Sequence, residues 1–210
     1  MTLDIAAIAA LAPVIPVLTI EERGSAVPLA RALVKGGLPV LEITLRTAAA
    51  LDALRAITAE VPDAVVGAGT VLNAGQLDEV RHAGARFAVS PGCTTALAEA
   101  AGMSGLPFLP GVQTVSEAME LADREFRLPK FFPADTAGGV GWLKAVAAPL
   151  AGLRFCPTGG IGADTAPAYL ALANVACVGG SWVAPKAAVA AGDWAVVERL
   201  AVAAATLKGR

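Results

Sequence analysis

The chain has 210 residues, of which 56% are hydrophobic and 16% charged, and its formal net charge is −2. This composition fits one large domain or two small ones, and the sequence pI near 5.4 argues against nucleic acid as a partner. The single histidine excludes a histidine-ligated metal cluster, and three cysteines without close spacing favour a reducing compartment, so we expect a cytoplasmic protein with no metal.

The N-terminal segment MTLDIAAIAALAPVIPVL is apolar, but it carries Asp4 and has no lysine or arginine before Arg23. It therefore lacks the basic start of a secretory signal. Its apolar run from Ala6 to Leu18 is too short to span a bilayer, so we expect no membrane association. We expect residues 2–11 to form an extra helix before the first strand, closing the bottom of the fold.

Short β-rich runs then alternate with alanine-rich helical stretches along nearly the whole chain. Alternating βα units fit either an open doubly wound sheet or a closed barrel. Eight units favour a compact (β/α)₈ TIM barrel, which we expect to be a single domain spanning residues 1–210. The expected strands lie near 13–18, 39–45, 65–69, 86–90, 106–110, 129–133, 153–158 and 175–180. The expected helices lie near 22–35, 48–60, 74–83, 94–102, 115–125, 138–148, 164–173 and 193–207.

Four polar residues stand where helix N-caps are expected, because their side chains can accept a hydrogen bond from the first turn. These residues are Asn73, Thr94, Ser116 and Asp193. In addition, Lys186 follows a proline at an expected helix start.

The two charged residues that interrupt apolar strands are Lys130, in LPKFFPAD (128–135), and Glu42, in LEITLRT (41–47). Burying an ammonium group is costly unless it is paired. One interpretation is a structural ion pair, although such pairs add little net stability. The interpretation that we favour is catalytic, because active sites of this fold lie at the carboxyl ends of the strands. Burial favours a neutral lysine amine, which can attack a ketone and form a Schiff base while a carboxylate moves protons.

Two further polar residues follow neighbouring strands. Arg46 has the same parity as Glu42 along the second strand, and its planar fork suits a substrate carboxylate. Arg46 could instead stay solvated or cap the next helix. Thr70 could add a hydroxyl to the same carboxylate, or it could be a helix-start residue before Asn73.

Glycine pairs follow the last two strands. Gly159 and Gly160 lead into the helix expected from Asp164, and Gly179-Gly180-Ser181 is expected to form a second turn. Backbone N–H groups can approach an anion at glycine turns, and barrel enzymes commonly bind phosphate after these two strands. The alternative interpretation is that these glycines end the strands for steric reasons. GAGT (67–70) lacks the third glycine of a dinucleotide-binding fingerprint.

Taken together, six motifs resemble the class I 2-keto-3-deoxy-6-phosphogluconate (KDPG) and 4-hydroxy-2-oxoglutarate (KHG) aldolases, and they occur in the order typical of that family. They are LEITLRT (41–47), GAGTVLN (67–73), SPG (90–92), KFFPA (130–134), PTGGI (157–161) and GGSW (179–182). The resemblance implies a homotrimeric barrel that acts as a carbon–carbon lyase on a 2-keto acid without metal or other cofactor. The products would be pyruvate and glyceraldehyde 3-phosphate.

The resemblance also implies residue roles. Lys130 would form the Schiff base, and Glu42 would be the general acid/base. The implied substrate-binding residues are Arg46 and Thr70 for the pyruvate carboxylate, Pro91 and Phe132 for the pocket lining, Thr158 for the substrate chain, and Gly159, Gly160, Gly180 and Ser181 for the phosphate.

One departure concerns the end of the first strand, where many relatives carry a basic residue and this chain has Leu18-Thr19-Ile20. KHG, which lacks a phosphate, is therefore an alternative substrate. A phosphosugar isomerase or synthase on the same barrel is a second possible class, and a non-catalytic oligomeric scaffold is a third. Neither of these needs an amine in the sixth strand, so covalent trapping with a keto acid distinguishes them from an aldolase.

Overall fold

The computed structural model describes residues 4–207. Residues 2 and 3 of the expected N-terminal helix and both ends of the expected 1–210 domain lie outside this range. The strands are β1 (Val14–Leu18), β2 (Val40–Thr44), β3 (Val65–Gly69), β4 (Phe87–Val89), β5 (Phe108–Leu109), β6 (Gly111–Val112), β7 (Lys130–Phe131), β8 (Cys156–Pro157) and β9 (Val178–Gly180). The helices are α1 (Ile5–Ala9), α2 (Arg23–Lys35), α3 (Ala50–Glu60), α4 (Ala74–His82), α5 (Thr95–Ser104), α6 (Val115–Asp123), α7 (Gly139–Val146), α8 (Ala166–Leu170), α9 (Lys186–Ala190) and α10 (Trp194–Ala205).

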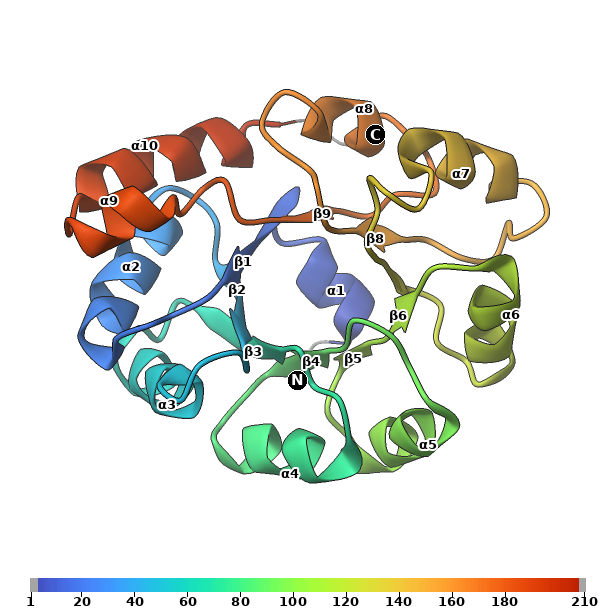
Figure 1. Cartoon of the computed structure of the whole chain (residues 1–210), viewed down its shortest axis with the longest axis horizontal. Helices are drawn as coiled ribbons and strands as arrows, with labels where there is room; N and C mark the ends of the chain where they lie inside the picture. Colours follow the sequence, from blue (N-terminus) through green and yellow to red (C-terminus); the bar gives the residue numbers. More distant parts are fainter. Residues whose placement is uncertain (1–3, 208–210) are drawn as a thin grey trace.

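The strands are parallel and form a closed ring surrounded by helices, which confirms the predicted α/β barrel (Figure 1). Six strands pair in the order β5-β4-β3-β2-β1-β9, and three pair in the order β6-β7-β8. The two sheets join where β5 runs into β6 and where two bridges, Phe155 to Val175 and Thr158 to Gly179, link the β8 segment to the β9 segment. Parallel pairing brings the carboxyl ends of all strands to one end of the ring.

The fifth expected strand, 106–110, is divided in the structure. Its first part, β5, pairs with β4, and the chain then continues past Pro110 as β6, which pairs with β7. Proline has no N–H to donate to a ladder, so a strand is interrupted at that residue. The carbonyl of Pro110 still accepts a hydrogen bond from Lys130 N at 2.8 Å, and this bond fixes the register of the lysine-bearing strand.

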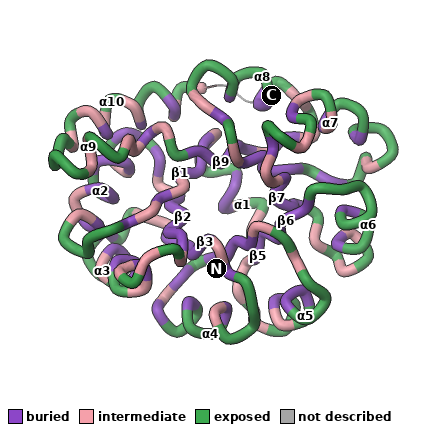
Figure 2. Tube along the Cα trace, in the orientation of Figure 1, coloured by how far each residue is buried: buried purple, intermediate pink, exposed green. Residues whose placement is uncertain are grey.

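Side chains alternate between the two faces of the ring, as the period of two in a strand requires. Outward-facing residues such as Leu41, Ile43 and Phe131 pack against the helices. Inward-facing residues form a separate apolar cluster with Ile8 and Ala9 of α1, which lies within the outline of the ring in Figure 1. Buried residues follow the strands and the inner sides of the helices, whereas the outer sides are exposed (Figure 2).

Helix starts agree with three of the four predicted caps. The side chains of Asn73, Thr94 and Asp193 each accept a hydrogen bond from the first turn of the following helix. The prediction of Ser116 is wrong, because Thr114 caps α6 and forms a capping box with Glu117, which satisfies two backbone donors together. No helix within residues 4–207 has both the length and the apolar character needed to cross a bilayer.

Candidate active site

Lys130 points into the barrel because its neighbour in β7 is anchored outside it. The Phe131 ring stacks on Trp142 of α7, with 4.3 Å between ring centroids and an interplanar angle of 11°. Strand alternation then directs Lys130 inward, where only 4% of the residue is exposed. The Lys130 Nζ lies 5.5 Å from the centroid of the Phe132 ring, so an apolar face adjoins the amine.

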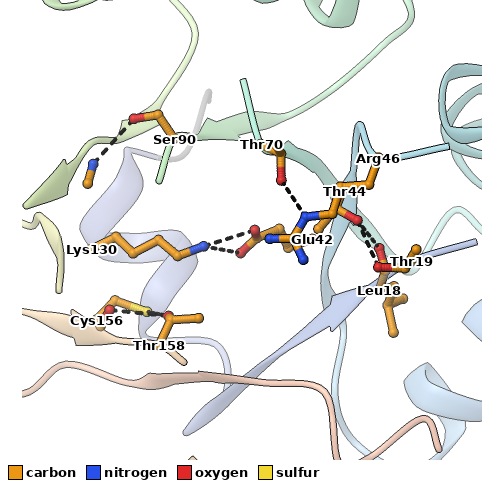
Figure 3. Close-up of polar contacts among 11 residues, drawn as sticks. Leu18, Thr19, Glu42, Thr44, Arg46, Thr70, Ser90, Lys130, Cys156 and Thr158 are labelled. Atoms are coloured by element: carbon orange, nitrogen blue, oxygen red, sulfur yellow. Dashed lines mark hydrogen bonds and ion pairs between the residues drawn. The ribbon is translucent and has the colours of Figure 1, made fainter. Parts of the chain in front are cut away.

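Glu42 of β2 meets this amine inside the ring (Figure 3). The Nζ of Lys130 is 3.1 Å from Oε1 and 3.4 Å from Oε2 of Glu42, and Glu42 is 2% exposed. The neighbouring strand makes room for this carboxylate through Gly69, where a Cβ atom would overlap the Glu42 side chain. The two charged residues of the strand interiors are thus one buried, hydrogen-bonded pair, as predicted.

Arg46 and Thr70 also meet, as the predicted carboxylate site requires. Arg46 Nε donates a hydrogen bond to Thr70 Oγ1 at 3.1 Å (Figure 3). Thr70 has a φ of 60°, a conformation that is strained for a β-branched residue and is typical of functional sites. The alternative that Thr70 starts a helix is wrong, because Asn73 is the N-cap of α4.

The first glycine pair forms a turn of the predicted kind. Gly159 and Gly160 have φ values of 100° and 77°, which only glycine adopts readily, and a Cβ at Gly160 would overlap Asp135. The helix expected over 164–173 covers only Ala166–Leu170. An anion at this turn would therefore meet backbone N–H groups rather than the end of a long helix.

The second glycine pair is not a turn, so that prediction is wrong. Gly179 and Gly180 belong to β9, and the chain turns only from Ser181 onward, where Ala184 N donates to the Ser181 carbonyl. Packing explains both glycines. A Cβ at Gly179 would overlap the Thr158 hydroxyl, and one at Gly180 would overlap the Trp182 ring.

A cavity of about 790 Å³ opens above the buried pair. Most of the predicted site residues line it: Arg46, Lys130, Phe132, Thr158, Gly159, Gly160, Gly180 and Ser181. Glu42 and Thr70 are not among the lining residues, but they are hydrogen-bonded to Lys130 and Arg46, which are. Pro91 is not among the lining residues; its backbone lies against Gly111, where a Cβ would overlap it. The volume suits a small-molecule ligand.

The cavity also includes residues that sequence analysis did not assign to the site, among them Thr19, Glu21, Glu22, Ser25, Trp182 and Lys186. Thr19 and Thr44 share a hydrogen bond at 3.1 Å at the ends of β1 and β2. Their positions at strand ends were a usable signal for Thr19 and Thr44. Lys186 had no such signal, because it follows β9 by several residues.

Two of the thiols are held in their protonated form. A hydrogen bond with the Cys156 thiol and complete burial raise the pKa of Cys177 well above its ordinary value. Burial raises the pKa of the Cys93 thiol to about 11, although Arg124 opposes this shift. Neither side chain is a thiolate near neutral pH, so neither has the form that acts as a nucleophile.

Comparisons with known proteins agree with this geometry. The model of the family "KDPG and KHG aldolase" matches residues 5–200. The chain is 53% identical over 189 residues to a 2-dehydro-3-deoxy-phosphogluconate aldolase of Pseudoalteromonas atlantica, covering 90% of this chain and 88% of that protein. It is 53% identical over the same length to the KHG/KDPG aldolase of Escherichia coli K12, covering 90% and 89%.

A solved structure of the KDPG aldolase of Legionella pneumophila, with pyruvate captured as a covalent carbinolamine, superposes with a TM-score of 0.94 at 47% identity and covers 96% of this chain and 98% of that one. The aldolase of Zymomonas mobilis with 3-phosphoglycerate also gives a TM-score of 0.94 at 47% identity, covering 100% and 98%. The chain therefore belongs to the KDPG and KHG aldolase family.

Proposed function

We propose that this chain is a Schiff-base aldolase that cleaves KDPG to pyruvate and glyceraldehyde 3-phosphate. The observation that carries the proposal is the buried amine of Lys130, which lies on the cavity wall 3.1 Å from the Glu42 carboxylate. An amine can act as a nucleophile only after it has lost its proton, and this carboxylate is close enough to accept one.

The proposed reaction begins when the neutral Lys130 amine attacks the C2 ketone and forms a carbinolamine. Glu42, directly or through a water molecule, donates the proton that lets the hydroxyl leave as water, which yields the imine. Glu42 then accepts the C4 hydroxyl proton as the C3–C4 bond breaks, which releases the aldehyde and leaves an enamine. Protonation at C3 and hydrolysis of the resulting imine return pyruvate and the free amine.

Other lining residues would orient the substrate. The Arg46 guanidinium, held by Thr70, is suited to the pyruvate carboxylate. Thr158 and Phe132 line the cavity together with Lys130 and would contact the substrate chain, whereas Pro91 lies outside this lining. The backbone N–H groups around Gly159, Gly160, Gly180 and Ser181 would bind the phosphate. The Legionella and Zymomonas proteins, which hold pyruvate and a phosphorylated acid, support these assignments.

KHG is a second proposed substrate, which would be cleaved to pyruvate and glyoxylate. The supporting observation is that Leu18 and Thr19, which line the cavity at the end of β1, provide no cation at this position. The Escherichia coli relative is named for both substrates.

We also propose a cytoplasmic homotrimer that serves the Entner–Doudoroff route of carbohydrate metabolism. The apolar composition and several exposed apolar side chains support oligomerisation, namely Leu72, Met103, Val115 and Met119. Light scattering coupled to size-exclusion chromatography should give three times the chain mass. A monomer at micromolar concentration would contradict this assembly.

The function is tested by incubating the protein with pyruvate and sodium borohydride and mapping the adduct by mass spectrometry. We expect an irreversible adduct on Lys130 and on no other lysine, and none in Lys130→Met. An unmodified protein would favour the isomerase or scaffold classes. An adduct on Lys144 or Lys186 would show that the site assignment is wrong.

A further inference from the structure

The cavity extends beyond the residues that the proposed chemistry uses. Its outer part lies between Glu21 and Glu22, which precede α2, and Pro185 and Lys186, at the start of α9. These side chains belong to segments that follow β1 and β9, two strands that pair with each other. The outer part is therefore continuous with the turn at Ser181, on the same side of the ring.

Three cations line the cavity, and they differ in their partners. Lys130 is paired with Glu42, whereas within residues 4–207 no ion pair joins Arg46 or Lys186 to a carboxylate. Arg46 instead donates to Thr70, beside the strand that carries Glu42. Lys186 is exposed and stands five residues beyond Ser181, so it is the cation on the β9 side of the cavity.

Without Lys186, this outer part would disfavour an anion. Glu21 and Glu22 line the same part of the cavity, and their negative charges disfavour an anion there. Backbone N–H groups at Gly160 and Ser181 can orient a phosphate, but they carry no net charge with which to offset two carboxylates. An ammonium group provides that charge, and its flexible stem lets it reach an anion that lies near the Gly159-Gly160 turn.

We propose that Lys186 is a specificity-determining residue that binds the phosphate at the far end of the substrate and offsets Glu21 and Glu22. This inference rests on the proposed aldolase function and adds a side-chain contact to the backbone phosphate site. Arg46 and Lys186 then bind the two anionic ends of one substrate, with the reacting ketone at Lys130 between them.

The test compares Lys186→Ala with the wild type on two substrates, KDPG for steady-state cleavage and pyruvate for borohydride trapping. Pyruvate lacks the phosphate-bearing end of KDPG, so trapping with pyruvate reports only the chemistry at Lys130. We expect the KM for KDPG to rise about fivefold to tenfold, between the effects of an exposed ion pair and of a hydrogen bond to a charged group. The kcat for KDPG and the trapping rate should stay within about twofold of the wild type.

Lys144→Ala is the matched control, because Lys144 is an exposed lysine of α7 that does not line the cavity, and its KM should not change. Glu22→Gln removes one negative charge from the cavity. It should therefore lower the KM for KDPG, whereas Lys186→Ala should raise it. The proposed role of Lys186 would be overturned if the KM of Lys186→Ala for KDPG were unchanged. It would also be overturned if the rate of pyruvate trapping fell by the same factor as the KM rose. Either result would leave the proposed aldolase function intact. Failure of the wild type to trap pyruvate would overturn the proposed function and this inference together.

Discussion

The two ends of the barrel interior are filled in opposite ways. At the end closed by α1, Ile8 and Ala9 pack on Ile15 and Leu109 in an apolar cluster. At the carboxyl end, Lys130 and Glu42 form a buried charged pair below an open cavity. Apolar packing contributes stability in proportion to the area removed from water, whereas a buried ion pair contributes little or costs stability.

The two ends of the barrel therefore have different roles, one in stability and the other in catalysis. The apolar end closes the ring with the cluster around Ile8 and Ala9. The polar end holds groups that a protein selected for stability alone would replace, and it places them where a substrate can enter. Changes at the polar end should therefore affect catalysis first, and changes at the apolar end should affect stability first.

The largest expected effect is at the polar end, in Glu42→Gln. Removing the carboxylate should lower kcat for aldol cleavage by about 10²–10⁴-fold, the contribution typical of proton transfer by a positioned side chain. The variant should still form the pyruvate adduct on Lys130, which steady-state kinetics and mass spectrometry together will check. Full activity would remove Glu42 from the mechanism.

A smaller effect, on stability alone, is expected at the apolar end in Ile8→Ala. Ile8 is 1% exposed, and its truncation should lower the free energy of unfolding by about 2–5 kcal/mol. Urea denaturation measures this loss, and Leu11→Ala, at a residue 44% exposed, is the control that should change it by less than about 0.5 kcal/mol. If Ile8→Ala abolished adduct formation while remaining folded, the two ends would not be separable.

The charged pair itself can be tested by replacing both partners. Lys130→Met/Glu42→Leu should raise the free energy of unfolding by about 1–4 kcal/mol relative to the wild type, because apolar residues of similar size avoid the desolvation of two ions. Glu42→Leu alone should instead destabilise the protein, since it leaves a buried ammonium unpaired. A double variant less stable than the wild type would favour the structural interpretation of the pair.

The smallest expected effect comes from a single methylene group in the apolar cluster. Ile15 lies on β1 and is 2% exposed, so Ile15→Val should lower the free energy of unfolding by about 0.5–1.5 kcal/mol. Its kcat should equal that of the wild type. A change in kcat beyond twofold would indicate that packing in this cluster is transmitted to the charged pair.

Sequence pattern alone was sufficient for the fold class and for the two residues of the buried charged pair. Eight alternating units predicted the barrel, and a lysine and a glutamate inside apolar strands identified the charged pair, because those features depend on local periodicity and on the cost of burying charge. Local signals were less reliable where more than one nearby residue could act as a helix N-cap. At the start of α6, Thr114 rather than Ser116 is the cap.

Only the tertiary structure decided the geometry with which these residues meet. Lys130 and Glu42 are 88 positions apart, and their 3.1 Å contact exists because the ring closes and because Gly69 leaves room for the carboxylate. Packing also decided that Gly179 and Gly180 stay in a strand rather than turn, and the turn after β9 brought Lys186 to the cavity. These outcomes depend on atoms far away in the chain, which no local pattern encodes.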